Sequence, residues 1–307
     1  MAPEPMELFS DPLIRTIAAP FLGALLLGVA IRLAGGSVGS GRRIAGAGIG
    51  LAFAWTAAMV FGAPAMPPAP GPDAIVSVAA AGLIAGLLFD VYGPSEGSGA
   101  HGRRQGPLWS GWPDWLEWSL ILAFGAGAAA WLLGGFGAAV PVIMLVWGLA
   151  VLRLRRVFGK DPDTLAGDAM VPVAMLMMAA AGLALIAAAA DLESDRELAL
   201  ALAAASGGFV LLALFDRSLG FGLTPVLGAG GGVLSLAVRM TDAAPFLIPA
   251  VAILGFIFFA DSLFRQPALA RFAGLRWGRF ALITLGALVP MALAAAVALI
   301  GAGFGGY

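Results

Sequence analysis

The run "WSLILAFGAGAAAWLLGGFGAAVPVIMLVWGLAVL", residues 118–152, contains no charged side chain. It lies between Glu117 and Arg153 and is too long for a single membrane crossing, because a helix needs about 20 residues to span the hydrocarbon core. The glycine-rich stretch "GGFGAAV" at 134–140 lies near its middle. We therefore expect two membrane-spanning helices here, joined by a hairpin at the glycines.

The composition of the whole chain agrees with this local pattern. Of its 307 residues, 61% are hydrophobic and 11% are charged, and the mean hydropathy is +0.97. A soluble domain has about 25% charged residues, so this chain has too few polar side chains to cover a surface in water. The predicted fold is an all-α, polytopic integral membrane protein with one membrane domain, 1–307, in the inner (cytoplasmic) membrane of the cell.

Apolar stretches of suitable length predict about ten transmembrane helices. Their expected ranges are 14–31, 44–63, 74–91, 116–133, 135–152, 169–190, 197–215, 219–238, 243–261 and 280–303. The acidic N-terminal residues lack the basic region of a cleavable signal peptide, so we expect the first span to be retained. Two near-equal halves, 1–157 and 165–307, meet at a basic loop.

The distribution of basic residues predicts the orientation. Fourteen of the 17 Arg and Lys residues lie in loops that follow odd-numbered spans, and the others are Arg15, Arg196 and Arg239. Loops rich in Arg and Lys stay in the cytoplasm. With an even number of spans, both termini are then expected outside the cytoplasm.

The eighth predicted span contains "GFGLTPVLGAGGGVLSL", residues 220–236. Proline removes a backbone donor and glycine weakens a helix, so this segment could be unwound and expose backbone groups to a solute, as in some transporters. The alternative is tight helix packing with a mild kink. The candidate substrate-path residues are Thr224, Pro225, Gly228, Gly230, Gly231 and Gly232.

Three spans end in similar sequences, "LLFDVYG", "ALFDRSLG" and "FFADSLF". Each places an aspartate, Asp90, Asp216 or Asp261, at the predicted cytoplasmic border. Together with Arg217 they could form a charged cytoplasmic mouth. The alternative is that they are helix stops.

The segment "PLWSGWPDWLEW", residues 107–118, carries Trp109, Trp112, Trp115 and Trp118. An indole ring prefers the level of the lipid headgroups. We interpret the four residues as interfacial anchors, and the alternative is a stacking platform for a ligand.

Several kinds of chemistry are not expected. The chain has no cysteine and a single histidine, His101, so we predict neither a metal site nor a cofactor. The net charge of -1 gives no attraction to nucleic acid. The basic loops 153–168 and 265–279 are expected to bind anionic headgroups of membrane lipids. Other membrane proteins or a second copy of the chain are further candidate partners.

Three functional hypotheses remain from the sequence. The first is a permease-like carrier of a neutral or amphiphilic solute or of a lipid. The second is a non-catalytic integral subunit of a membrane complex, with small-residue faces packed on partner helices. The third is a lipid-modifying enzyme that uses Asp90, Asp216 or Asp261 with Arg217. Enzymatic activity is the less expected outcome, since no serine in the spans has a visible activating base.

Overall fold

The computed structural model describes residues 11–35, 41–62, 74–92, 114–158, 169–266 and 269–305, and no β-strand occurs among them. The elements are η1 (Ile14–Ala18), α2 (Ala19–Ala34), α3 (Gly41–Ile44), α4 (Ala47–Phe61), α5 (Ile75–Tyr92), α6 (Asp114–Leu132), α7 (Ala139–Phe158), α8 (Met170–Ala189), α9 (Glu193–Phe215), α10 (Leu223–Pro225), η3 (Val226–Gly230), α11 (Gly231–Ala243), η4 (Pro245–Leu247), α12 (Ile248–Leu254), η5 (Gly255–Arg265), α13 (Ala270–Ala273) and α14 (Arg276–Gly305).

Eight helical segments of the described chain are long and apolar enough to cross a membrane. They are Ile14–Ala34, Ile75–Tyr92, Trp115–Leu132, Met170–Ala189, Glu193–Phe215, Leu223–Ala243, Pro245–Leu263 and Arg276–Gly303. The chain is therefore an all-helical protein of the multi-pass membrane type. The predicted count of about ten spans is not confirmed by this measure, because α4 and α7 are not among the eight.

The two remaining helices fall short for different reasons. Helix α4 has 15 residues and ends before Gly62, whose positive φ of 86° breaks the helical path. Helix α7 has 20 residues, but Arg153 and Arg155 lie in its last turns. Its start at Ala139, four residues later than predicted, follows from the turn at Gly134, where φ is 70°. The predicted hairpin at 134–140 is confirmed.

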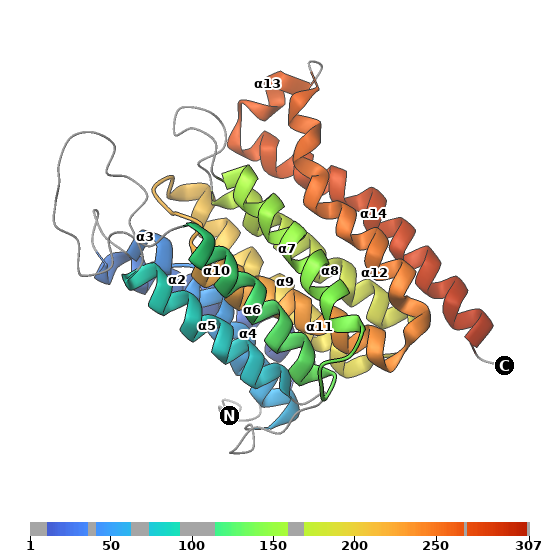
Figure 1. Ribbon diagram of the computed structural model, residues 1–307. Coiled ribbons are helices and arrows are strands. Elements are labelled where there is room, and N and C mark those ends of the chain that lie inside the picture. The colour runs from blue at the N-terminus through green and yellow to red at the C-terminus, as the bar shows by residue number, and fades with distance from the viewer. Residues whose placement is uncertain are drawn as a thin grey trace, which may run out of the picture.

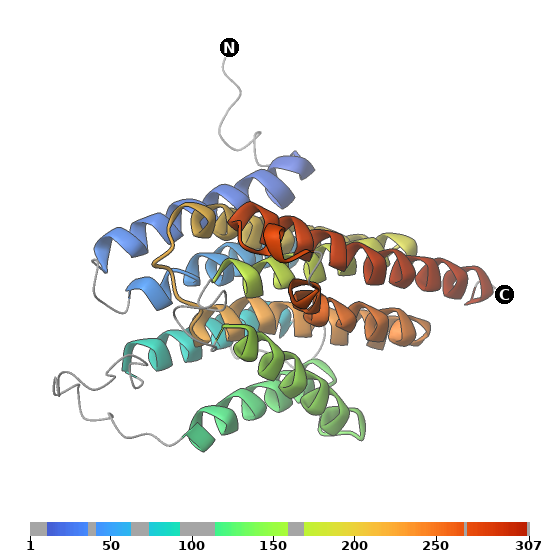
Figure 2. The same cartoon turned by 90° about the horizontal axis from the view of Figure 1, so that it is seen from above.

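The centre of the bundle consists of α8 and the composite helix 223–243, which joins α10, η3 and α11. Both are apolar on almost every face, and a helix of that kind is buried among others. The helices run side by side along one long axis (Figure 1), with α2 at one edge of the bundle and the α6–α7 pair at the opposite edge (Figure 2). Helix α13 and the start of α14 project beyond the other helices (Figure 1).

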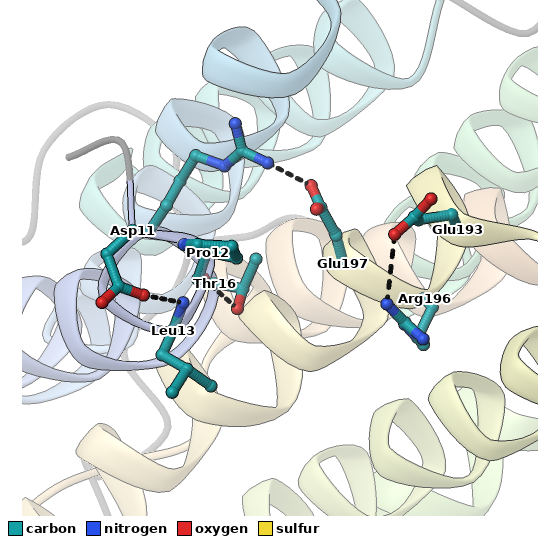
Figure 3. Close-up of polar contacts among 8 residues, drawn as sticks. Asp11, Pro12, Leu13, Thr16, Glu193, Arg196 and Glu197 are labelled. Carbon is teal, nitrogen blue, oxygen red and sulfur yellow. Dashed lines mark hydrogen bonds and ion pairs between the residues drawn. The ribbon is translucent and has the colours of Figure 1, made fainter.

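Charged side chains mark the two ends of the bundle. At one end Arg15 pairs with Glu197 at 2.6 Å, and Figure 3 shows Glu197 next to the Glu193–Arg196 pair of the same helix. At the same end Phe246 packs against Gly301 near the end of α14. The start of η1 and the end of α14 therefore lie at the same end of the bundle. We name this end the acidic end, after the carboxylates of α9. The opposite end, which we name the basic end, holds the ion pairs Arg32–Asp216, Arg153–Asp261 and Arg155–Glu117.

The α6–α7 pair forms an antiparallel hairpin. The Arg155–Glu117 ion pair, 2.9 Å long, joins the end of α7 to the start of α6. Halfway along, the Trp147 indole N–H donates a hydrogen bond of 3.0 Å to the carbonyl of Ile121. The two helices thus cover the same depth of the bundle in opposite directions.

Candidate functional site

The glycine-rich segment predicted as a substrate path remains helical. Residues 226–230 form a turn of π-helix between α10 and α11, so the backbone widens there and is not unwound. All residues from Leu223 to Gly232 are buried, including Thr224 and Pro225. The structure therefore places the predicted path residues inside the packed centre of the bundle.

Three of the glycines receive aromatic rings from three neighbouring helices. A Cβ atom on Gly230 would lie 2.9 Å from the ring of Trp147 in α7. On Gly231 it would lie 2.9 Å from Phe124 in α6, and on Gly232 2.9 Å from Phe53 in α4. Because a side chain at any of the three positions would displace a ring, these glycines support the interpretation as tight packing.

Asp90 and Thr224, which the sequence assigned to different sites, are in direct contact. The Asp90 carboxylate accepts hydrogen bonds from the backbone N–H groups of Leu223 and Thr224, at 2.9 and 2.8 Å, and from the Thr224 hydroxyl at 2.6 Å. The first N–H groups of a helix lack intrahelical partners and carry partial positive charge. Asp90, at the end of α5, therefore caps the central helix from a separate element.

The other two aspartates of the predicted mouth have different partners. Asp216 accepts a 2.9 Å bond from Arg32 and bonds of 2.8 and 2.6 Å from the N–H and hydroxyl of Ser218. Partial burial alone would raise the pKa of Asp216, but the bonds from Ser218 and Arg32 outweigh it, so the pKa lies below 3.8. Asp261 pairs with Arg153 at 2.7 Å, and Arg217 is exposed. Each aspartate is thus held by its own set of partners.

Two of the four predicted anchors can be placed. Trp115 is 64% exposed at the start of α6. Trp118 is half-buried, with the Arg155 guanidinium 5.8 Å from its ring centre. Trp109 and Trp112 lie outside the described residues, as does His101. The interfacial role of these tryptophans stays a prediction.

An apolar cavity lies beneath α7, between that helix and α8, α11, α12 and η5. Its volume is about 100 Å³. The lining side chains are aliphatic or aromatic, and none is charged; they are Val146, Trp147, Ala150, Leu154, Leu176, Ala179, Leu183, Gly230, Val233, Leu234, Ala237, Val251, Leu254, Gly255 and Phe258. Val146, one of these residues, is 59% exposed, so the lining reaches the outer surface of the bundle at α7.

One end of this cavity carries a charged pair. Arg153 lies in α7, after the lining residue Ala150, and it directly precedes the lining residue Leu154. Its Nε–H donates a 3.2 Å bond to the carbonyl of Phe258, another lining residue. Its Nη2 bonds to Asp261 at 2.7 Å. The Arg153–Asp261 pair therefore stands at the edge of the apolar cavity toward the basic end.

A second hollow, of about 330 Å³, lies at the acidic end and is more polar. Asp195 and Arg239 line it and form an ion pair of 2.6 Å. The guanidinium of Arg239 also lies 4.5 Å from the ring centre of Phe61. This ion pair joins the start of α9 to the end of α11, and Asp242 adds a further carboxylate to the lining.

Sequence reasoning missed both hollows. The cavity beneath α7 is lined by ordinary apolar residues of six elements, and no motif distinguishes them from neighbours that face lipid. The pairing of Arg239 with Asp195 could have been suspected only because both are charged residues near the ends of predicted spans. No group of three or more potential metal-binding side chains occurs among the described residues.

Comparison of the chain with protein families, with curated proteins and with solved structures finds no match.

Proposed function

We propose that this protein is a permease-like carrier of the inner membrane that takes up an amphiphilic solute or a lipid in the cavity beneath α7. The observation that carries the proposal is an uncharged lining that reaches the outer surface of the bundle at Val146. A molecule dissolved in the membrane can enter such a cavity sideways without crossing water. A purely polar solute would find no hydrogen-bonding side chain along the lining other than the Trp147 indole, which is already bonded.

The size of the cavity suits part of an apolar chain. A single water molecule needs about 10–15 Å³, so a cavity of about 100 Å³ has room for a short apolar segment. An apolar cavity of this kind excludes water. Inside a bilayer, a hydrocarbon chain is the occupant that costs least to place there.

The carrier is expected to cross the membrane ten times, with both termini outside the cytoplasm. The antiparallel α6–α7 hairpin supports α7 as a full span, because its ion pair with Glu117 and its turn at Gly134 lie at opposite ends of α6. Helix α4 covers about 22 Å at 1.5 Å per residue, and it packs between α2 and the central helix, where Gly48 contacts α2 and Gly46 contacts Pro225. The concentration of arginine at the basic end supports a cytoplasmic location for that end.

Blocking the cavity tests the function. The protein would be reconstituted into vesicles that contain a fluorescent phosphatidylethanolamine, and flipping of the label to the outer leaflet would be followed with a membrane-impermeant quencher. Ala150 lines the cavity, whereas the adjacent Leu149 is 57% exposed on the lipid face of α7. Ala150→Phe should reduce flipping strongly, and Leu149→Phe should leave it unchanged.

Two results would contradict this proposal. One is wild-type protein that flips no more lipid than empty vesicles, and the other is equal activity in the two variants. The alternative proposal, a non-catalytic subunit, is supported by the long apolar face that α14 leaves exposed, with Leu285, Val289 and Leu293 more than half exposed. Reproducible co-purification of other membrane proteins in mild detergent would favour that alternative. A lipid-modifying enzyme has less support, because Asp90, Asp216 and Asp261 are each engaged in hydrogen bonds.

A further inference from the structure

We infer that the Arg153–Asp261 pair is the headgroup site of the cavity beneath α7, and that it selects an amphiphile whose headgroup carries both a phosphate and an ammonium group. This inference rests on the proposed function, since it assumes that an apolar chain occupies the cavity. It adds the class of molecule to which that chain belongs.

The first argument is the position of the pair. The bond from Arg153 to the Phe258 carbonyl fixes the guanidinium at a residue that lines the cavity. Its covalent neighbour Leu154 lines the cavity as well. A chain that fills the cavity and ends toward the basic end would therefore bring its headgroup to this pair.

The second argument is the unused hydrogen-bonding capacity. A guanidinium has five N–H donors and a carboxylate has two acceptor oxygens. Arg153 uses two donors, one to Phe258 and one to Asp261 Oδ1, and the described residues provide partners for no others. Asp261 Oδ2 likewise has no partner among them. The pair thus offers donors that suit a phosphate beside an acceptor that suits an ammonium group.

The third argument is the charge balance. Arg153 and Asp261 are mostly buried, with side chains 18% and 11% exposed, so their charges are only partly screened by water. A headgroup with a single negative charge would be attracted by Arg153 and repelled by Asp261. A headgroup with a single positive charge would be attracted by Asp261 and repelled by Arg153. A zwitterion can place each of its charges beside the opposite one, as in the complementary pairing of charged groups at other interfaces.

The next charged residue of α7 that the structure describes has a partner of its own. Arg155, two residues along α7, pairs with Glu117 at 2.9 Å. The ring of Phe259 lies 5.1 Å from the guanidinium centre of Arg153 and covers one side of it. The Phe258 carbonyl and the Phe259 ring therefore hold the guanidinium in place. Neither group is charged, so the positive charge remains available to Asp261 and to a ligand.

Native mass spectrometry of the purified full chain in detergent provides the test. Four probes with the same dodecyl-length chain would be titrated: a lysophosphatidylethanolamine, an alkyl phosphate, an alkylamine and a monoacylglycerol. The zwitterion should bind about tenfold more tightly than the uncharged monoacylglycerol, which corresponds to one additional charge-assisted interaction. The two singly functionalised probes should fall between or below these.

A double variant, Arg153→Gln with Asp261→Asn, separates headgroup recognition from chain binding. It keeps hydrogen-bonding side chains of similar size, and it should bind all four probes with the affinity that the wild type shows for monoacylglycerol. Retained binding of monoacylglycerol also shows that the variant is folded. If the variant does not fold, the ranking of probes on the wild type decides alone.

The possible failures are distinguishable. If no probe binds the wild type, the proposed carrier site itself is wrong and the headgroup inference falls with it. If all probes bind equally, or if the alkyl phosphate or the alkylamine binds at least as tightly as the zwitterion, the headgroup inference is wrong while the apolar site stands. The Ala150→Phe variant and the wild type would also compete for the monoacylglycerol. Weaker binding by the variant is expected if the chain lies in the cavity.

Discussion

Replacing Gly86 by alanine should separate two helices that the structure holds in backbone contact. A Cβ atom at Gly86 would lie 2.6 Å from the Cα of Thr224 and 2.9 Å from the carbonyl oxygen of Leu223. Ordinary van der Waals contact begins at 3.4 Å, so the backbones must move apart by about 0.8 Å. Both atoms belong to the main chain, and a change of side-chain rotamer cannot relieve the contact.

The shift would also reach the carboxylate cap of the central helix. Asp90 lies one turn after Gly86 on the same face of α5, and its bond to the Thr224 N–H is 2.8 Å long. An increase of about 0.8 Å would carry that bond beyond hydrogen-bonding distance. Overpacking costs about 1–3 kcal/mol, and weakened bonds to a charged group cost about 1.5–3 kcal/mol. Alanine restores about 1 kcal/mol of helix propensity, so the expected net loss is about 1.5–5 kcal/mol.

Unfolding by SDS in mixed micelles, followed by tryptophan fluorescence, would measure this loss. Gly127 provides the matched control, because it lies in a membrane-spanning helix and an added Cβ would meet no atom within 4 Å. Gly127→Ala should be neutral or slightly stabilising. Equal stability of the Gly86→Ala and Gly127→Ala variants would refute the close contact between α5 and the start of the central helix.

Three further predictions follow from contacts near the two ends and the middle of the bundle. Asp216→Asn should lower stability at neutral pH, and because the folded pKa lies below 3.8, this difference from the wild type should vanish as the pH falls through that pKa in acid unfolding curves. Trp147→Phe removes the donor to Ile121 and should cost about 1 kcal/mol or less in the SDS assay, as for other hydrogen bonds between membrane helices; a loss as large as that for Gly86→Ala would contradict this. In the cysteine-free chain, an impermeant maleimide should label Gly137→Cys in intact cells but Leu275→Cys only after permeabilisation, and the reverse pattern would overturn the orientation.

Much of the architecture could be predicted from hydropathy alone. The uncharged run 118–152 indicated two helices with a glycine turn, and the turn at Gly134 is where the structure places it. Hydropathy does not determine helix ends well, because main-chain geometry decides them. Gly62 ends α4 early and the turn after α6 delays α7, so the bounds of these two helices differ from those that the sequence suggested.

The contacts within the candidate site could be predicted much less well. The glycine cluster 228–232 indicated close packing, but which rings fill the space depends on how α4, α6 and α7 are arranged around it. Asp90 and Thr224 are far apart in sequence and meet only because α5 runs antiparallel to the central helix. The cavity beneath α7 has no sequence signature, since its lining residues resemble those that face lipid.

The π turn at 226–230 affects how related sequences should be aligned. Such a turn closes its hydrogen bonds one residue later than an α turn, so it acts as a single inserted residue. Each residue rotates a helix by roughly 100°, and a regular helix read through this segment would therefore point Gly231, Gly232 and Ser235 toward the wrong neighbours. A homologue that lacks the widened turn should be aligned with a one-residue gap inside 226–230, and omitting that gap would misassign every lining position that follows.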